Sequence, residues 1–326
     1  MQQRNHIPIV GNSDEKFFPG LSVAFLSLLN AASGKYDYTF YVLNGGLSEQ
    51  SLQKLESQLQ ELSAKKGITV TLNSIQVDER KLQSLPQRRG SRMPYAKLIL
   101  PDLLPTEPYA VYVDADILYN RGVEELYNKS KSASNWLLSG VRDYHSVIGN
   151  ECPWIHQLTS DEKQLPYINS GFMMMNLKDF RKNGLLDEAI TLRAAAGEQR
   201  LGDQSVFNFV CRGKILLNHE SLNHLVALGS GLHIFENGLE SNIHFIGKNK
   251  PWFSQPNISQ YTAHKLWHSF ADEYNITRPV SALSPPDPQL LKKHQRKCWT
   301  NLFNPKRAQH YKNDLASIKK LNSATQ

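Results

Sequence analysis

The sequence predicts an α/β fold in which a mainly parallel central sheet forms a single nucleotide-binding domain. Short apolar segments at 7–10, 38–43 and 68–72 fit buried strands, and apolar residues recur at helical spacing between them. Strands that alternate with helices from the start of a chain are typical of βαβ units, whose strands run parallel. Ligands of such sheets bind beyond the carboxyl ends of the strands, so the polar loop at 11–17 is a candidate site.

Each of the following elements has its own signal. Pro19 suits the first turn of a helix, and the apolar run behind it predicts a helix that covers the sheet. Ser48 is a candidate N-cap for a second helix, in which leucines recur from Leu52 to Leu62. Residues 110–113 fit a buried strand, and the methionine run at 173–175 predicts a buried strand rather than a cofactor motif. Asp203 precedes an apolar helix at 206–210 and fits a plain helix cap equally well.

Length and composition exclude several classes of protein. The 326 residues suffice for one large α/β domain or two smaller ones. Neither G-x-G-x-x-G nor a P-loop motif occurs, which argues against a dinucleotide fold and a P-loop enzyme. The polar start of the chain lacks a signal peptide, and no apolar run reaches about 20 residues, so a cytoplasmic protein is expected. Cys152, Cys211 and Cys298 are widely scattered and are expected to be reduced thiols.

The basic charge gathers at the end of the chain. Nine of the 37 Lys and Arg residues, but only one of the 30 acidic residues, lie at 288–326. A proline-rich hinge at 284–288 therefore separates an expected domain at 1–284 from a basic, aromatic, helical extension at 285–326. Basic residues mixed with aromatic ones suit an anionic membrane surface, which predicts peripheral binding to the cytoplasmic face of the inner membrane. A solvated helix packed on the body is the alternative, whereas the neutral body argues against nucleic acid.

An Asp-Ala-Asp sequence carries the first candidate chemistry. Asp114 and Asp116 follow the apolar strand 110–113, and residues two apart in an extended chain point to the same side. Both carboxylates can therefore face one divalent cation. Asp-x-Asp alone is weak, because solvated aspartates often end a strand. Its position at the end of a buried strand favours a ligand site.

Two further clusters contain suitable partners. At 242–252, His244 offers an imidazole that would favour Mn²⁺, Lys250 a cation for a phosphate, and Gly247 close approach of the backbone. A core histidine in a short strand is the plain alternative for His244. Asn169 and Ser170 lie at the polar mouth of the methionine strand.

Taken together, these stretches resemble glycosyltransferase family eight, the group that contains glycogenin and bacterial lipopolysaccharide and lipooligosaccharide galactosyl- and glucosyltransferases. The resemblance covers about residues 7–253 and rests on the order and spacing of six stretches: Ile9-Val-Gly-Asn-Ser-Asp14, Tyr95-Ala-Lys97-Leu, Tyr112-Val-Asp-Ala-Asp116, Asn169-Ser-Gly171, Asp203-Gln204 and His244-Phe-Ile-Gly-Lys-Asn-Lys-Pro-Trp252. Lys97 stands where bacterial members usually carry Arg and is similar to the glycogenin arrangement. The resemblance implies a GT-A type fold.

The resemblance also implies roles for individual residues. Mn²⁺, with Mg²⁺ as the alternative, would be held by Asp114, Asp116 and His244. The uridine diphosphate sugar would be bound by Asn12, Asp14, Phe17, Lys97, Asp143, Asn169, Ser170, Gly247 and Lys250, with Phe17 stacked on the base. Asp203 and Gln204 would lie beside the reacting sugar as the catalytic residues.

The implied reaction is transfer of glucose or galactose, with retention of configuration, to a lipopolysaccharide core or another glycan or lipid-linked acceptor. Double displacement needs a carboxylate nucleophile, for which Asp203 is the nominee, and same-face attack fits equally well. A haloacid-dehalogenase phosphatase also uses Asp-x-Asp but expects Thr or Val at the place of Leu118, and a nucleotidyltransferase expects a glycine-rich basic first loop. A sugar-binding or membrane-associated scaffold with an inactive transferase fold is the non-enzyme alternative.

Overall fold

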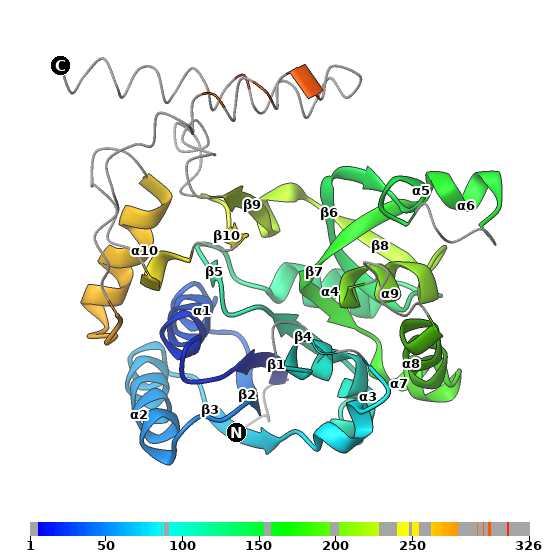
Figure 1. Ribbon diagram of the computed structural model, residues 1–326. Coiled ribbons are helices and arrows are strands. Elements are labelled where there is room, and N and C mark those ends of the chain that lie inside the picture. Colours follow the sequence, from blue (N-terminus) through cyan, green and yellow to red (C-terminus); the bar gives the residue numbers. More distant parts are fainter. Residues whose placement is uncertain are drawn as a thin grey trace.

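A computed structural model describes most of the chain (Figure 1). The described residues are 6–85, 87, 91–152, 158–195, 202–227, 240–247, 250–253 and 262–279, with 292, 296, 299, 300 and 312 singly. The predicted extension at 285–326 therefore lies almost wholly outside the described residues, as does Cys298. No helix in the described part of the chain is long and apolar enough to cross a membrane.

A seven-stranded sheet forms the centre of the fold. In spatial order its strands are β3 (Val70–Gln76), β2 (Asp37–Asn44), β1 (His6–Ser13), β4 (Ala110–Val113), β7 (Pro166–Met175), β6 (Leu138–Val147) and β8 (Ile215–Asn218). The first four are parallel, β7 is antiparallel to both neighbours, and β8 is parallel to β6. The predicted mainly parallel sheet is confirmed, with one antiparallel strand in its middle.

A smaller, three-stranded sheet lies at the carboxyl end of β4. It consists of β5 (Ile117–Leu118), β10 (Ile243–Ile246) and β9 (His224–Ala227). β10 pairs with β5 antiparallel, so that His244 lies opposite Ile117. This pairing carries a segment from late in the chain to the loop that follows β4.

Helices cover both faces of the large sheet (Figure 1). One face packs on α1 (Phe18–Asn30) and α2 (Glu49–Lys66), and α10 (Thr262–Glu273) packs against α1 in the same core. The other packs on η2 (Met93–Ile99), α3 (Leu100–Leu103), α7 (Leu177–Lys182), α8 (Leu185–Ala195) and α9 (Asp203–Val210). Alternation decides which face a strand residue serves, because successive side chains point to opposite sides: Val111 and Val113 belong to the first core, and Ala110 and Tyr112 to the second.

The remaining described elements are short. They are α4 (Glu124–Ser132), α5 (Ile148–Glu151), α6 (Ser160–Gln164), η1 (Glu79–Leu82), η3 (Glu220–Leu222) and η6 (Pro251–Phe253).

Local predictions can be compared with the structure. Ser48 is the N-cap of α2, where its hydroxyl accepts a hydrogen bond from the Ser51 amide at 3.2 Å, and Pro19 lies in the first turn of α1, as predicted. The methionine run is a buried strand, and Cys152 and Cys211 are free and buried. The reading of Asp203 as a helix cap is wrong. Gly202 occupies the N-cap of α9, because the Asp203 side chain turns instead to a buried lysine.

Candidate active site

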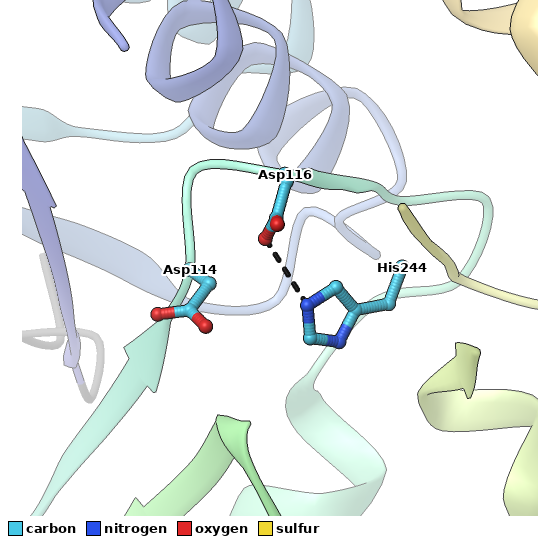
Figure 2. Close-up of side chains that lie close together, drawn as sticks. All are labelled: Asp114, Asp116 and His244. Carbon is cyan, nitrogen blue, oxygen red and sulfur yellow. Dashed lines mark ion pairs between the residues drawn. The ribbon is translucent and has the colours of Figure 1, made fainter. Parts of the chain in front are cut away.

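Asp114, Asp116 and His244 converge at the end of β4 (Figure 2). The Asp114 amide donates to the Gly171 carbonyl on β7 at 2.6 Å, and the Phe245 amide on β10 donates to the Asp116 carbonyl at 2.8 Å. These backbone hydrogen bonds fix the loop after β4 between β7 and β10. His244 Nε2 lies 3.1 Å from Asp116 Oδ1, and ligand atoms of all three residues lie within 4.8 Å of one another.

This cluster fits a divalent cation. Oxygen and imidazole donors suit Mn²⁺, and two donors at about 2.1 Å from one cation, at right angles, are about 3 Å apart, close to the His244–Asp116 separation. Asp116 Oδ1 is buried and faces His244 Nε2, and a cation between them would be a partner for both atoms. The space beside the cluster depends on Gly171, because a Cβ there would lie 2.4 Å from His244 Cε1 and 2.6 Å from Asp114 Oδ2.

Asp116 is held ionised by its neighbours. Burial opposes ionisation, but the charges of His244 and Lys250 and their hydrogen bonds bring the pKa of Asp116 below the usual carboxyl range. The Lys250 ammonium contacts Asp116 Oδ2 and also donates to the Phe245 carbonyl at 2.7 Å. Lys250 lies just before η6 and is 7% exposed, so this contact is made away from solvent.

Lys97 links the first aspartate to a second acidic group. It projects from η2, is 5% exposed, and places its ammonium 2.6 Å from Asp203 Oδ2 and 3.7 Å from Asp114 Oδ1. Ser170 Oγ donates to the same Asp203 oxygen at 3.1 Å. Burial disfavours the charged lysine, yet Asp114 and Asp203 raise the pKa of Lys97 above its usual value. Lys97 therefore acts as a buried cation between the two carboxylates.

A set of amides lines the next part of the site. Gln204 Oε1 accepts hydrogen bonds from Asn169 Nδ2 at 3.2 Å and from the Ser170 amide at 3.1 Å. Gln204 Nε2 donates to Asp143 Oδ2 at 2.6 Å. Burial raises the pKa of Asp143, although hydrogen bonds from Gln204 and Asn169 oppose this. The structure thus brings together an amide cluster, which consists of Asp143, Asn169, Ser170, Asp203 and Gln204. It lies beside the metal-type cluster of Asp114, Asp116 and His244.

The three residues expected at the nucleoside lie at the end of β1. Asn12 Nδ2 donates to the Met93 carbonyl at 2.7 Å, and Asp14 Oδ1 accepts from the Phe17 amide at 2.9 Å. The half-buried Phe17 ring makes edge contacts with Trp252 and Phe253, at centroid distances of 5.5 and 6.1 Å. Their proposed contacts with uridine stay predictions.

A cavity of about 550 Å³ opens beside these residues, where β2 and β3 end. It is lined by Asn44, Gly45, Gly46, Gln76, Val77, Asp78, Arg80 and Met93. Its size is that of a small-molecule site, and Met93 connects it to Asn12. Gly247, which follows β10, has a φ of 92°, a left-handed conformation that favours glycine.

Asn223 is a residue at this site that the sequence reasoning missed. It is 2% exposed, its Oδ1 lies 3.0 Å from His244 Nδ1, and its Nδ2 donates to Asn169 Oδ1 at 3.1 Å. No motif distinguishes this asparagine in the sequence. Only the pairing of β9 with β10 brings it beside the histidine.

Comparison with known proteins agrees with this architecture. A Haemophilus influenzae protein that carries the name glycosyltransferase is 23% identical over 218 residues, which cover 66% of this chain and 62% of that protein. General stress protein A of Bacillus subtilis is 21% identical over 84% of this chain and 93% of its own length. The chain therefore spans less than two thirds of the Haemophilus protein.

Solved structures show the same fold. The galactosyltransferase LgtC, in complex with donor and acceptor sugar analogues, superposes with a TM-score of 0.61 at 17% identity, over 88% of this chain and 100% of its own. The bifunctional glycosyltransferase WbbM in its apo form gives a TM-score of 0.63 at 16% identity, over 91% of this chain but 52% of its own.

The fold is that of GT-A glycosyltransferases, and it carries a candidate Asp-Asp-His metal site. The model of Glycosyl transferase family 8 matches residues 8–255, and the chain belongs to that family. The resemblance described from the sequence is thereby confirmed.

Proposed function

We propose that this protein is a retaining, Mn²⁺-dependent hexosyltransferase that moves glucose or galactose from a uridine diphosphate sugar to a glycan acceptor. The observation that carries the proposal is the contact between the metal-type cluster and the amide cluster, which offer different chemical groups. Asp114, Asp116 and His244 offer donors for a cation, and Lys97 joins Asp114 directly to Asp203 in the adjoining amide cluster. A diphosphate on the first cluster would place its sugar on the second.

The chain's own residues divide the work of the reaction. When bound, the cation would supply Lewis-acid stabilisation of the leaving diphosphate. Lys250 is poised to neutralise a phosphate by moving from Asp116, and Lys97 pairs with Asp203 and holds it in place. Asn169 and Gln204 present amide groups that suit sugar hydroxyls. We propose that the nucleoside extends from Asn12 toward the cavity beside Met93.

The ion pair of Asp203 bears on how configuration is retained. One Asp203 oxygen accepts from both Lys97 and Ser170, and such a paired carboxylate is a weaker nucleophile than a free one. This favours same-face attack, with Asp203 and Gln204 orienting the sugar, over formation of a sugar–enzyme ester.

The acceptor is proposed from the composition of the chain alone. The basic, aromatic segment 285–326 suits a lipid-linked acceptor, such as a lipopolysaccharide core, at an anionic cytoplasmic membrane surface. Deletion of 285–326 should abolish sedimentation with vesicles rich in anionic lipid. Unchanged sedimentation would contradict the membrane proposal and leave the transfer reaction untouched.

The donor and metal are tested by thermal unfolding against a panel of nucleotide sugars with and without Mn²⁺. A ligand that binds only the folded protein raises the midpoint with its affinity, so uridine diphosphate glucose or galactose should raise it only when Mn²⁺ is present. Asp116→Asn should remove the shift, whereas Asp161→Asn, on α6 away from the site, should keep it.

Transfer of labelled hexose to water or glycan then separates an enzyme from a binding scaffold. Absence of any shift with every nucleotide sugar would contradict the proposed function.

A further inference from the structure

Asn223 connects the candidate metal ligand His244 to the amide cluster. Its two amide atoms serve different partners: Oδ1 faces His244 Nδ1 at 3.0 Å, and Nδ2 faces Asn169 Oδ1 at 3.1 Å. All three side chains are buried, with exposures of 2% for Asn223, 3% for His244 and 7% for Asn169. At such buried positions, a polar group without a partner would lower the free energy of unfolding by about 1–3 kcal/mol.

Hydrogen bonds link His244, Asn223 and Asn169 in a row, and a backbone donor sets the direction of each bond. The Gly171 amide can only donate, and it does so to Asn169 Oδ1 at 3.0 Å. That oxygen can only accept, so the group facing it from Asn223 must be the NH₂. The other end of Asn223 is then its oxygen, and His244 Nδ1 must carry a proton to donate to it. Nε2 faces the Asp116 carboxylate, and when Nε2 carries no proton its lone pair is available to a cation.

A second backbone amide orients the other branch of the row. The Ser170 amide donates to Gln204 Oε1 at 3.1 Å, which leaves Gln204 Nε2 to donate to Asp143. Asn169 joins the two branches, because its Nδ2 also donates to Gln204 Oε1. The orientation of the histidine and that of the amides proposed to bind the sugar are thus set by one antiparallel strand, β7.

We propose that Asn223 is a positioning residue, which holds His244 in the Nδ1-protonated tautomer with Nε2 toward the metal and ties that ligand to Asn169. The role of His244 as a metal ligand rests on the proposed function. Its Nδ1 proton does not, because it follows from the hydrogen bonds alone. Partners of this kind around a ligating histidine typically change metal affinity 10–100-fold when removed.

Two substitutions separate the two halves of this role. Asn223→Leu keeps the size of the side chain and removes both hydrogen bonds. Asn223→Asp keeps an oxygen for His244 Nδ1 but cannot donate to Asn169. Asn242→Leu is the matched control: Asn242 is fully buried beside β10, and its side chain bonds Asn120, Arg121 and Leu222 rather than the metal-type cluster.

Mn²⁺ alone is the first probe, with free ion followed by electron paramagnetic resonance. Asn223→Leu should weaken Mn²⁺ binding 10–100-fold, and Asn223→Asp should stay within a few-fold of wild type. Asn223→Asp should instead lose the extra thermal shift that a uridine diphosphate hexose gives over uridine diphosphate. Wild-type Mn²⁺ affinity in folded Asn223→Leu, or an equal loss in Asn242→Leu, would overturn the proposal.

The second measurement uses metal-free protein, so it stands even if the proposed function fails. Nitrogen-15 chemical shifts of His244 should show a protonated Nδ1 in the wild type and in Asn223→Asp. In Asn223→Leu the Nδ1 proton should be lost, because the Asp116 carboxylate at Nε2 is the acceptor that remains. A wild-type histidine protonated only at Nε2 would overturn the proposal by itself, whether or not any variant folds. Absence of Mn²⁺ binding to the wild type, with the expected tautomer present, would count against the proposed function alone.

Discussion

Lys250 and His244 contact different oxygens of the same Asp116 carboxylate, Lys250 at Oδ2 and His244 at Oδ1. The lysine therefore neutralises the carboxylate that we propose to hold a cation. A diphosphate offers the ammonium a competing partner, and its departure from Asp116 would strengthen the attraction of that carboxylate for metal. Nucleotide and metal binding are then linked through one side chain.

Lys250→Met should separate these two events. Without nucleotide, the variant should bind Mn²⁺ several-fold more tightly, because a positive charge beside the ligand is gone. The increase of Mn²⁺ affinity on adding uridine diphosphate should shrink by about tenfold, which corresponds to about 1.4 kcal/mol. Mn²⁺ titrations with and without the nucleotide measure both effects. Lys265→Met, at an exposed position on α10, is the control, and unchanged linkage in Lys250→Met would refute the exchange.

The Lys97–Asp203 pair should contribute to folding as a unit. Lys97→Met leaves a buried carboxylate without its nearest cation and should lower the free energy of unfolding by about 3–5 kcal/mol. Lys97→Met combined with Asp203→Leu should cost less than the sum of the single changes, by about 0.5–3 kcal/mol. Urea unfolding of the four proteins gives this coupling. Strict additivity would show that the two charges do not interact in the folded state.

Gly171→Ala tests the space beside the metal-type cluster. The new methyl would lie 2.4 Å from His244 Cε1, so His244 or Asp114 must move, and Mn²⁺ affinity should fall at least tenfold. Overpacking should also lower stability by about 1–3 kcal/mol. Gly140→Ala, on the neighbouring strand β6, meets the side-chain end of Ile168 at 2.9 Å and serves as control. It should affect stability without changing Mn²⁺ binding, and a similar loss of metal in both variants would reject the local explanation.

Buried His264 predicts a dependence of stability on pH. Burial lowers the pKa of His264 from 6.5 to about 3, with the charge of His268 adding to the effect. Between pH 6.5 and about 3, His264 is therefore protonated in the unfolded chain but neutral in the folded protein. The free energy of unfolding falls as the pH drops through this range. The slope from this residue is at most about 1.4 kcal/mol per pH unit.

Urea unfolding between pH 7 and 4 gives the free energy of unfolding at each pH. This free energy should depend less steeply on pH in His264→Leu than in the wild type. His219→Leu, at an exposed position beside η3, controls for loss of any imidazole. Identical slopes in wild type and His264→Leu would show that His264 takes up its proton in the folded state.

Local signals in the sequence predicted the strand–helix alternation and the position of Asp114 and Asp116, because apolar periodicity and the end of a buried strand depend on near neighbours alone. His244 carried two readings, core residue and ligand, and its geometry fits both at once: it is 3% exposed and faces Asp116. The contacts of Asp203 and Asn223 could not be predicted. Each depends on a partner brought close by tertiary pairing, Lys97 in one case and His244 in the other.

The pairing of β5 with β10 has a consequence for how the site comes into being. Asp116 and Lys250 are separated by 134 residues, so the chain must be synthesised as far as Lys250 before the two can meet. Closing so long a loop costs entropy and tends to come late in folding. A nascent or trapped chain would carry both aspartates but no imidazole beside them. We expect tight Mn²⁺ binding at the proposed site to report a completed fold, so that the metal would be a probe of maturation.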